Sequence, residues 1–410
     1  MSLSEDLAWR GLIKDKTFDD NAFLDEPNTF YHGVDASSDS LTIGNLAVLL
    51  LARRLLDADW KTVLLVGGAT SLIGDPGGKD AERPLQSRDK ITKNVEAIKS
   101  QIDKLFGGKP FIHADNYEWF SDMRYLDFLR DVGKHFSMTE LMQRDFVSER
   151  MGEHGGGISY AEFSYSLIQG YDYWQLYQKQ GAVLQIGGSD QWGNMLSGVA
   201  LIRKKESKEV HAMSMPLVVD KATGRKFGKT EAGAIWLDPA KTTPTQFYQF
   251  WINTDDADVE DYLKVFTLLS KEEIESLMTE QKASPAARGA QTALAQQVTN
   301  LVHGQSGDSE EVSKYLTGQV SIAEASEENL NRLNRYMLTK PETIQSVLVN
   351  SGLASSHTEA KRLLSEGGVY INNKQITRDS FEESDFSNNR LLLRRGKKFR
   401  DSVVIEKQYG

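Results

Sequence analysis

Short apolar runs that end in glycines alternate with helical patterns through the first half of this chain. The run TVLLVGG (residues 62–68) and the run AVLQIGG (residues 182–188) have the uninterrupted apolar character of strands buried on both faces. Residues 46–56 carry apolar side chains at helical spacing. Buried strands joined through helices form a parallel sheet, and ligands of such sheets bind beyond the carboxyl ends of the strands. The sequence therefore predicts a doubly wound, Rossmann-like α/β domain with a site at that edge.

The pattern changes twice further along the chain. After about residue 239 the strand signals fade, and residues 243–303 show a succession of helical patterns. Near the end a capped helix (SSHTEAKRLLSEGG), a short strand (VYIN), an Asn-Asn-Lys turn and a basic strand pair (RLLLRRGKKFR) follow one another. We therefore expect three domains: the α/β domain over residues 1–235, a helical domain over residues 236–325 and a small α+β domain over residues 335–410.

The composition excludes several classes of protein. There is no cysteine, so a disulfide, a thiol nucleophile and a cysteine-ligated metal are ruled out, and the 7 histidines form no His-x-x-x-His pair. We expect no protein-bound metal. No run of eighteen apolar residues occurs, and residues 1–16 lack a secretory pattern, so we expect a cytoplasmic protein without a membrane span. The net charge of −10 argues against indiscriminate nucleic-acid binding, although from residue 341 onward 11 Lys and Arg outnumber 9 Asp and Glu.

The segment TGRKFGKT (residues 223–230) ends in Gly-Lys-Thr, as a phosphate-binding P-loop does. A P-loop needs four residues between its two glycines, but only Arg225, Lys226 and Phe227 separate Gly224 from Gly228. The following EAGAIWLDP is too rich in Gly and Pro to open a helix. The spacing excludes a P-loop kinase and leaves two readings, a lysine loop that contacts phosphates and a plain surface loop.

Three other polar segments lie where the predicted sheet would gather them. YHGVDASSDSLTIGNL (residues 31–46) crowds small residues at a helix start, where backbone N–H groups can hold a phosphate, although an ordinary capped helix has the same pattern. GGATSLIGDPGGK (residues 67–79) places Asp75 just past a buried strand, and QIGGSDQWGN (residues 185–194) again runs a strand into glycines and an aspartate. Both positions favour ligand-binding carboxylates over simple turn residues.

The segment YAEFSYSLIQGYDYWQLY (residues 160–177) places three polar side chains on one helix face. Tyr165, Gln169 and Asp172 stand at i, i+4 and i+7. A solvated polar stripe has the same spacing, but the aromatic neighbours all round this helix favour a small polar pocket.

Taken together, these segments resemble the bacterial tyrosyl-tRNA synthetase family of class I aminoacyl-tRNA synthetases, over essentially the full chain. YHGVDASSDSLTIGN resembles the first signature region of that family, LVGGATSLIGDP the next strand and loop, FLRDVGKHFSM and EFSYSLIQGYDYWQLY the amino-acid pocket, LQIGGSDQWGN the ribose loop and KFGKT the second signature. VTNLVHG resembles the helical, anticodon-recognition domain, and SGLASSHTEAKRLLSEGGVYINNKQI resembles an S4-like RNA-binding domain. The resemblance implies a homodimeric tyrosine–tRNA ligase, which forms tyrosyl-adenylate from L-tyrosine and ATP with Mg²⁺ and then transfers tyrosine to the terminal adenosine of tRNA(Tyr).

The resemblance also implies roles for individual residues. Tyrosine binding is assigned to Tyr31, Asp75, Tyr165, Gln169, Asp172 and Gln191. ATP binding is assigned to Gly33, Asp35, Ser37, Gly44, Gly188, Asp190 and Lys229. Catalysis, through contacts with the phosphates, is assigned to Thr42, Asn45, Lys79, Arg83, Lys226, Lys229 and Thr230. RNA binding is assigned to Lys361, Arg362, Lys374, Arg394 and Arg395.

One departure from the family pattern leaves alternatives open. The first signature normally reads His-Ile-Gly-His, whereas this chain has Thr42-Ile43-Gly44-Asn45. The Asn45 amide can still donate to a phosphate oxygen, as a neutral imidazole would. A non-catalytic paralogue that binds tRNA or mRNA is one alternative. Such a protein would tolerate loss of the KFGKT loop, whereas this chain has the loop intact. A tryptophan-specific relative is the other, but indole offers only an N–H donor and has no use for Asp172 facing Tyr31.

Overall fold

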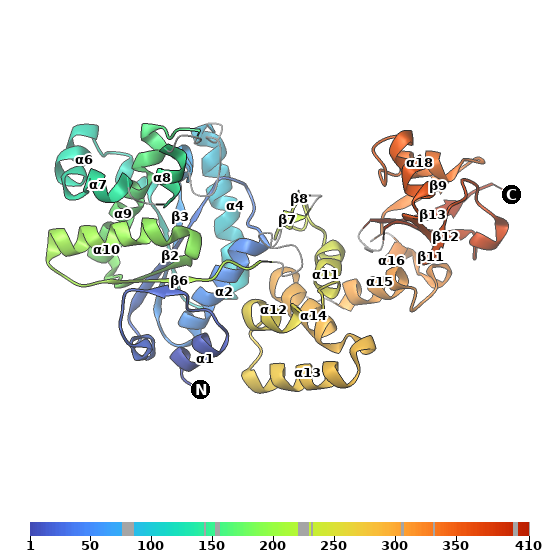
Figure 1. The fold of residues 1–410 in the computed structure, drawn as a ribbon, viewed down its shortest axis with the longest axis horizontal. Helices are drawn as coiled ribbons and strands as arrows, with labels where there is room; N and C mark the ends of the chain where they lie inside the picture. The colour runs from blue at the N-terminus through green and yellow to red at the C-terminus, as the bar shows by residue number, and fades with distance from the viewer. Residues whose placement is uncertain are drawn as a thin grey trace. The chain divides into compact units, whose positions relative to one another are not determined.

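The computed structural model describes residues 1–75, 86–142, 145–151, 156–219, 229–230, 233–304, 307–330, 333–396 and 401–409. The chain divides into two compact units (Figure 1). The N-terminal unit contains Met1–Lys241 and Glu260–Glu275, and the C-terminal unit contains Thr242–Val259 and Ser276–Gly410.

A six-stranded sheet forms the centre of the N-terminal unit, in the order β1-β6-β5-β2-β3-β4. Its strands are β1 (Asp15–Lys16), β2 (Thr29–Asp35), β3 (Lys61–Gly67), β4 (Ile112–Asp115), β5 (Leu184–Gly188) and β6 (His211–Met215). All neighbours pair in parallel except β1, which runs antiparallel to β6 at the edge. Six of the seven residues of β3 are buried, as expected for a strand covered on both faces. The predicted doubly wound parallel sheet is confirmed.

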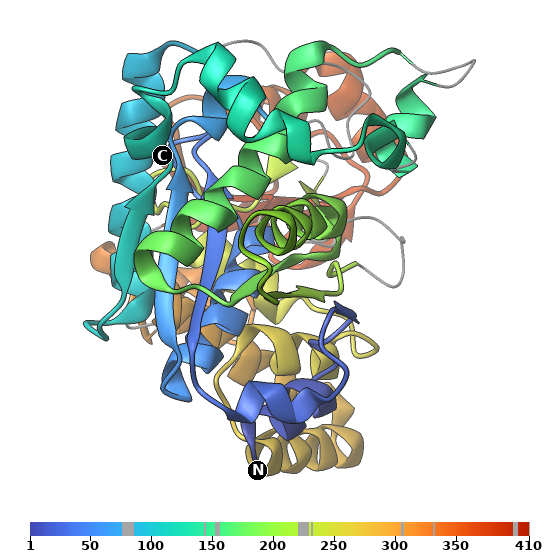
Figure 2. The ribbon, with the colours of Figure 1, turned by 90° about the vertical axis from the view of Figure 1, so that its left-hand side faces the viewer.

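Helices cover both faces of this sheet. In Figures 1 and 2, α9 and α10 lie over one face, while α2 and α4 lie over the other. The helices of this region are α1 (Leu3–Trp9), α2 (Ile43–Asp57), α3 (Thr70–Ile73), α4 (Arg88–Phe106), α5 (Tyr117–Phe120), α6 (Tyr125–Asp131), α7 (Met138–Met142), α8 (Asp145–Met151), α9 (Tyr160–Gln180) and α10 (Trp192–Glu206). Helices α9 and α10 approach closely at Gly198, where a Cβ atom would lie 2.6 Å from Cβ of Tyr173. A side chain there would push the two helices apart.

The pocket helix α9 is fixed at both ends by local chemistry. Ser159 and Glu162 form a reciprocal capping box at its start, and Gly181 ends it in the left-handed conformation with φ of 71°. Arg150 of α8 binds both carboxylate oxygens of Glu162, at 2.9 and 3.0 Å. These hydrogen bonds set the position and the rotation of the helix that carries Tyr165, Gln169 and Asp172.

A succession of helices follows, as the sequence predicts. They are α11 (Pro244–Ile252), α12 (Val259–Phe266), α13 (Lys271–Ala283), α14 (Gly289–His303), α15 (Gly307–Thr317) and α16 (Glu327–Leu330). The stretch Glu260–Glu275, which holds α12 after its first residue and the start of α13, belongs to the N-terminal unit. Within the C-terminal unit, α11 packs against α14 and α15. Between α13 and α14 the chain forms the short 3-10 helix Pro285–Ala287.

The last part of the chain is a small α+β domain with a five-stranded sheet in the order β11-β10-β12-β13-β9. Its elements are β9 (Arg335–Leu338), α17 (Ile344–Asn350), α18 (His357–Ser365), β10 (Val369–Ile371), β11 (Lys374–Ile376), β12 (Arg390–Arg395) and β13 (Ser402–Lys407). The predicted turn is confirmed, because Asn372 and Asn373 take left-handed φ values of 46° and 66° between β10 and β11.

The central strands of this small sheet are buried on both faces. Leu391 and Leu393 of β12 join the core beneath α17 and α18, whereas Leu392 packs with Tyr315 and Leu330 from the preceding helices. Successive side chains of a strand point to opposite faces, so the alternation follows from strand geometry. The small domain and the described apolar residues between Val312 and Leu330 therefore share an apolar core.

Candidate active site

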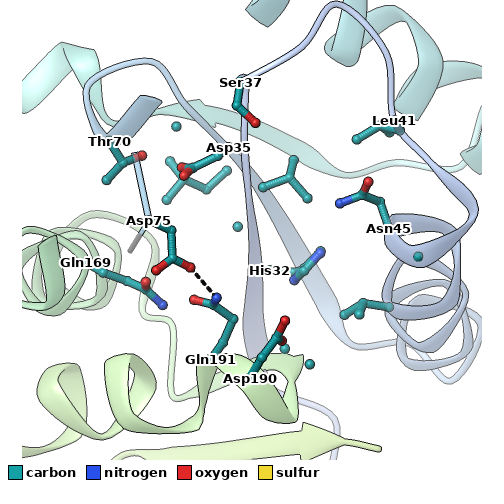
Figure 3. Close-up of a pocket in the computed structure, with 18 of the residues that line it drawn as sticks. His32, Asp35, Ser37, Leu41, Asn45, Thr70, Asp75, Gln169, Asp190 and Gln191 are labelled. Atoms are coloured by element: carbon teal, nitrogen blue, oxygen red, sulfur yellow. Dashed lines mark hydrogen bonds between the residues drawn. The ribbon is translucent and has the colours of Figure 1, made fainter. Parts of the chain in front are cut away.

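A cavity of about 610 Å³ opens where the strand order of the large sheet reverses. Strands β3 and β4 lie to one side of β2, and β5 and β6 lie to the other, so the carboxyl ends of β2 and β5 border the opening. Doubly wound sheets bind their ligands at this point. The cavity brings together Tyr31, Gly33, Asp35, Ser37, Thr42, Gly44, Asn45, Asp75, Tyr165, Gln169, Asp172, Gly188, Asp190 and Gln191. Figure 3 shows part of its lining, with Asp35, Asn45 and Asp75 among the labelled residues.

One part of the cavity pairs a phenol with a carboxyl group, Tyr31 on β2 and Asp172 on α9. Each residue is 1% exposed. Burial raises the pKa of Tyr31 well above its usual value, and the charge of Asp172 raises it further. The hydroxyl of Tyr31 is buried without a hydrogen-bond partner among the described residues. Tyr31 therefore offers a ligand a buried hydroxyl whose hydrogen-bonding capacity is unused.

Two donors hold the carboxyl group of Asp172 in place. Trp119 donates its indole N–H to Oδ1 at 2.8 Å, and Asn116 donates its side-chain amide to Oδ2 at 3.0 Å. These donors favour the ionised form, but burial dominates and raises the pKa of Asp172 to about 8. Without a ligand, the carboxyl group of Asp172 therefore gains or loses its proton slightly above neutral pH. The sequence reasoning missed Asn116 and Trp119, which follow β4 and carry no motif of their own.

A second part of the cavity collects carboxylates and their partners. Gln191 donates its side-chain amide to Asp75 at 2.5 Å, and Tyr165 donates its hydroxyl to Asp35 at 2.9 Å. Figure 3 shows Gln169 beside Asp75 and Gln191. Burial raises the pKa of Tyr165, and the charges of Asp35 and Asp75 raise it further. Two carboxylates next to neutral donors make this a place for a positively charged ligand group.

The start of α2 forms the opposite wall of the cavity. The backbone N–H and the hydroxyl of Thr42 both donate to Oδ1 of Asn45, at 3.0 and 2.9 Å. The oxygen of Asn45 is thus used at the helix start, and Figure 3 shows its nitrogen on the side that faces the cavity. Thr42 and Asn45 together form a cap that leaves an amide donor available to a ligand.

The segment after the KFGKT loop is anchored to this wall. The backbone of Ile43 donates to Ile235 at 3.1 Å, and that of Leu237 donates to Leu41 at 2.9 Å. Strand β7 (Lys229–Thr230) pairs with β8 (Gly233–Ala234), which sets Lys229 opposite Ala234, a residue that lines the cavity. The predicted residues Lys79, Arg83 and Lys226 lie outside the described residues, and for Lys229 and Thr230 the description covers the backbone alone.

His32 also lines the cavity, although the sequence reasoning did not select it. It is 6% exposed, and its Nδ1 lies 3.1 Å from the carbonyl oxygen of Ile186 on the neighbouring strand. Burial lowers the pKa of His32 to about 4, so the ring is neutral near pH 7. Its place next to Tyr31 in the segment YHGVDASSDSLTIGNL was the signal that could have found it.

The predicted RNA-binding residues differ in their exposure. Lys361 and Arg362 on α18 and Lys374 on β11 are exposed. Arg395 is half-buried, and its guanidinium group pairs with Glu359 at 2.9 Å. The structure does not support the predicted RNA contact of Arg394. This residue lies within β12, is 6% exposed and stacks over the ring of Tyr370 at 4.8 Å. Burial lowers the pKa of Arg394, and this side chain is not a surface contact for RNA.

Within the described part of the chain, no group of three or more His, Cys, Asp or Glu side chains is arranged to hold a metal ion. Over the same residues, no helix is both long enough and apolar enough to cross a membrane.

Comparison with known proteins gives consistent matches. Residues 24–314 match the family model of class I tRNA synthetases (W and Y), and residues 326–400 match the SYY-like C-terminal domain of tyrosine–tRNA ligases. A tyrosine–tRNA ligase of Streptomyces avermitilis is 42% identical over 98% of both chains, and one of Acidothermus cellulolyticus is 44% identical over 92% of both. The C-terminally truncated mitochondrial tyrosyl-tRNA synthetase of Aspergillus nidulans is 32% identical, with a TM-score of 0.67 over 78% of this chain and 94% of that one.

Proposed function

Because the chain belongs to the tyrosine–tRNA ligases of class I, we propose that the cavity between β2 and β5 activates L-tyrosine with ATP. The observation that carries this proposal is the buried pair of Tyr31 and Asp172. A site built to bond a hydroxyl rejects an analogue that lacks it, because buried polar atoms are then left unpaired. This enzyme family is itself the standard example of the effect, with a discrimination of about 10⁵ against phenylalanine.

The polar groups of the cavity suit the two ends of tyrosine. We assign the phenolic hydroxyl to Tyr31 and Asp172, and the ammonium group to the part of the cavity that holds Asp75, Tyr165 and Gln169, with Gln191 beside them. The carboxylate of the substrate then points toward the start of α2. Because Gln191 already binds Asp75 at 2.5 Å, the ammonium group enters a site whose carboxylate is oriented in advance.

The reaction needs no side-chain base. The carboxylate of tyrosine attacks the α-phosphate of ATP in line, the bond to pyrophosphate breaks, and tyrosyl-adenylate remains. The protein contributes positioning and stabilisation of the charge that develops on the phosphates. We assign Gly33, Asp35, Ser37, Gly44, Gly188 and Asp190 to ATP.

The charge on the departing pyrophosphate calls for donors and cations. We assign Asn45 and Thr42 at the start of α2 to the phosphates, together with Lys79, Arg83, Lys226, Lys229 and Thr230. Mg²⁺ belongs to the substrate in this scheme, because it enters on the oxygens of the triphosphate. We place the reaction in the cytoplasm.

The test is tyrosine-dependent exchange of pyrophosphate into ATP, without tRNA, compared with phenylalanine and tryptophan. We expect exchange with tyrosine alone. Exchange with tryptophan would support the tryptophan-specific alternative. A folded protein that binds tyrosine but supports no exchange would be the non-catalytic paralogue, and it would show that Thr42 and Asn45 do not replace the signature histidines.

For the second step, we propose that residues 236–325 recognise the anticodon and that residues 335–410 form an S4-like RNA-binding domain. Lys361, Arg362 and Lys374 support this assignment, because they present positive charge on the surface of one small domain, where they can contact phosphates of a folded RNA. Transfer of tyrosine to the terminal adenosine of tRNA(Tyr) then completes the reaction.

We also propose a homodimer, and one surface of the N-terminal unit supports it. Of the 11 exposed large apolar side chains among the described residues, 6 lie on α6–α9: Tyr125, Leu126, Met138, Met142, Met151 and Tyr160. Leu126 is 75% exposed. Large apolar side chains that are exposed on consecutive helices suit an interface with another protein. We assign a second copy of this chain as the partner, since the tyrosyl-tRNA synthetase family is typically dimeric.

A further inference from the structure

We propose that Gln101 on α4 is a positioning residue for the activation of tyrosine. Through Ser40 and Leu41, its side chain holds the segment that follows the KFGKT loop against the start of α2. The inference rests on the proposed function and deepens it, because it says how the same cavity keeps its phosphate-binding segments together. Gln101 belongs to none of the motifs that the sequence reasoning selected, and it does not line the cavity.

The side-chain amide of Gln101 binds two neighbouring residues of the loop before α2. Its Oε1 accepts the backbone N–H of Leu41 at 2.9 Å, and its Nε2 donates to the hydroxyl oxygen of Ser40 at 3.1 Å. Both partners are buried, since Ser40 is 5% exposed and Leu41 is 2% exposed. Because one planar amide uses its donor and its acceptor on adjacent residues, it fixes both the position and the rotation of this part of the loop.

Helix α4 holds the same loop at a second point. The side-chain amide of Asn94, which is 3% exposed, donates to the carbonyl oxygen of Ala36 at 2.8 Å. Asn94 and Gln101 stand at i and i+7, so they share one face of α4. One helix face therefore binds the backbone of the loop near its beginning and at its end.

The segment that follows the KFGKT loop binds Ser40 and Leu41 as well. The hydroxyl of Ser40 donates its only proton to the carbonyl oxygen of Leu41 at 2.9 Å, so its lone pairs can accept from others. The backbone N–H of Asp238 donates to that hydroxyl at 3.2 Å, and the backbone N–H of Leu237 donates to the carbonyl oxygen of Leu41 at 2.9 Å. Ser40 and Leu41 thus connect Gln101 with residues 237–238, and a shift of Gln101 moves the anchor of that segment.

Three segments that we assign to the phosphates meet at this junction. Thr42 begins the turn into α2 and forms an antiparallel bridge with Trp236. Lys229 lies on β7, which pairs with β8 shortly before Trp236 in the chain. Residues 79–83 precede α4, the helix that carries Gln101. The amide of Gln101 is therefore placed where it sets these segments relative to one another.

The lysine of the KFGKT loop depends on such an anchor. A lysine side chain is long and flexible, so its charge is placed only as well as the backbone that carries it. A misplacement of about 1 Å can slow a reaction by about 10²-fold. The residues assigned to tyrosine lie elsewhere, with Tyr31 on β2 and Asp172 on α9. A change at Gln101 should therefore slow the chemical step and leave the affinity for tyrosine intact.

The test is a double-mutant cycle between Gln101→Leu and Lys229→Ala. The measured quantities are kcat for tyrosine-dependent pyrophosphate exchange and the dissociation constant of tyrosine, which also reports whether the site is folded. Gln101→Leu removes the donor and the acceptor at similar volume, whereas Gln101→Glu keeps an acceptor for the N–H of Leu41. Gln175→Leu is the matched control, because the half-buried Gln175 donates to the hydroxyl of Tyr171 at 2.7 Å and does not line the cavity.

We expect Gln101→Leu to lower kcat by about 10- to 100-fold with tyrosine affinity unchanged, Gln101→Glu to retain part of the rate, and Gln175→Leu to match wild type. In the Lys229→Ala protein, Gln101→Leu should cost less than about threefold, because the lysine that it positions is already absent.

An equal loss in the two backgrounds would overturn the proposal, and so would a wild-type kcat in Gln101→Leu. A loss of tyrosine affinity in Gln101→Leu and in Gln101→Glu would give Gln101 a merely structural role, which also overturns it. Absence of exchange by wild type would instead defeat the proposed activity itself.

Discussion

The indole N–H of Trp119 donates to Oδ1 of Asp172 at 2.8 Å, so a residue far from the pocket helix in sequence holds the carboxyl group that faces Tyr31. Asn116 holds the other oxygen at 3.0 Å and also donates to Thr70 at 3.1 Å. The carboxyl group is thereby fixed in rotation before any ligand arrives. Preorganisation of this kind lets a site pair with a hydroxyl at little further entropic expense.

Replacing Trp119 by Phe should therefore weaken the binding of tyrosine. The substitution removes one donor to a buried carboxyl group and keeps an aromatic ring, and the loss of one hydrogen bond corresponds to about 2- to 10-fold. The measurement is the dissociation constant of tyrosine, together with kcat for pyrophosphate exchange. Trp174→Phe is the matched control, since the Trp174 indole donates to Glu206 at 2.7 Å and does not line the cavity. Equal affinities in the two variants would contradict the role of Trp119.

Asp172 should also make stability depend on pH. Its pKa is about 8 in the folded protein and 3.8 as an ordinary side chain, so between these values the folded state binds more protons than the unfolded state. Stability then falls as pH rises through this window. The lowered pKa of His32 acts in the opposite direction between about 4 and 6.5, but it is common to wild type and to Asp172→Asn. In urea titrations without ligand, we expect wild type to lose stability relative to Asp172→Asn from pH 5 to pH 8. A constant difference between the two proteins would contradict the raised pKa.

Asn45→Asp should separate the two functions of Asn45. A carboxylate oxygen still accepts from Thr42 at the helix start, but the amide donor that faces the cavity is replaced by a negative charge. Because a single donor to a developing oxyanion is typically worth about 10²–10³ in rate, we expect exchange to slow by at least that much, with unfolding temperature and tyrosine affinity nearly unchanged. Thr42→Ser, which keeps the hydroxyl, should remain active. Wild-type exchange by Asn45→Asp would remove Asn45 from the phosphate site.

Charge reversal on α18 should affect tRNA without affecting activation. Lys361→Glu and Arg362→Glu are expected to raise the KM for tRNA several-fold and to leave pyrophosphate exchange at the wild-type rate. Point variants are preferable to a truncation near residue 335, because removal of β12 and β13 would expose the apolar residues of 312–330 that pack on Leu392 and Val404. Lys61→Glu is the control, since Lys61 is an exposed lysine at the amino end of β3. If the control and the two variants charge tRNA equally well, the small domain is not the contact surface.

The apolar surface of α6–α9 should control the oligomeric state. Leu126→Asp places a charge at the most exposed side chain of this surface, and we expect sedimentation to show a monomer where wild type sediments as a dimer. Leu268→Asp, at a residue that is 39% exposed and outside the surface, is the matched control. A dimer that persists in Leu126→Asp would exclude this surface as the interface.

Local sequence signals sufficed for the framework of the site. The apolar run at residues 62–68 corresponds to β3. Tyr165, Gln169 and Asp172, which were predicted to share one helix face, all line the cavity. Both results follow from regular geometry, because side-chain direction repeats every two residues in a strand and about every 3.6 in a helix. The carboxyl ends of parallel strands meet at one edge, so even distant loop residues were expected together, and Asp75 and Gln191 are in fact hydrogen-bonded.

Tertiary packing alone decided the rest. Arg394 looked like a surface cation in sequence, but β12 is covered on both faces and its guanidinium group stacks on Tyr370. The sequence reasoning selected neither His32 nor Trp119. Their places in the site follow from their contacts with Ile186 on the neighbouring strand and with Asp172 on α9. The sequence by itself determined the parallel sheet, the pocket helix and the family, because these depend on local periodicity and long contiguous segments. Which polar atoms are buried, held or left without a partner depends on contacts between residues distant in the chain, and only the folded structure decides those.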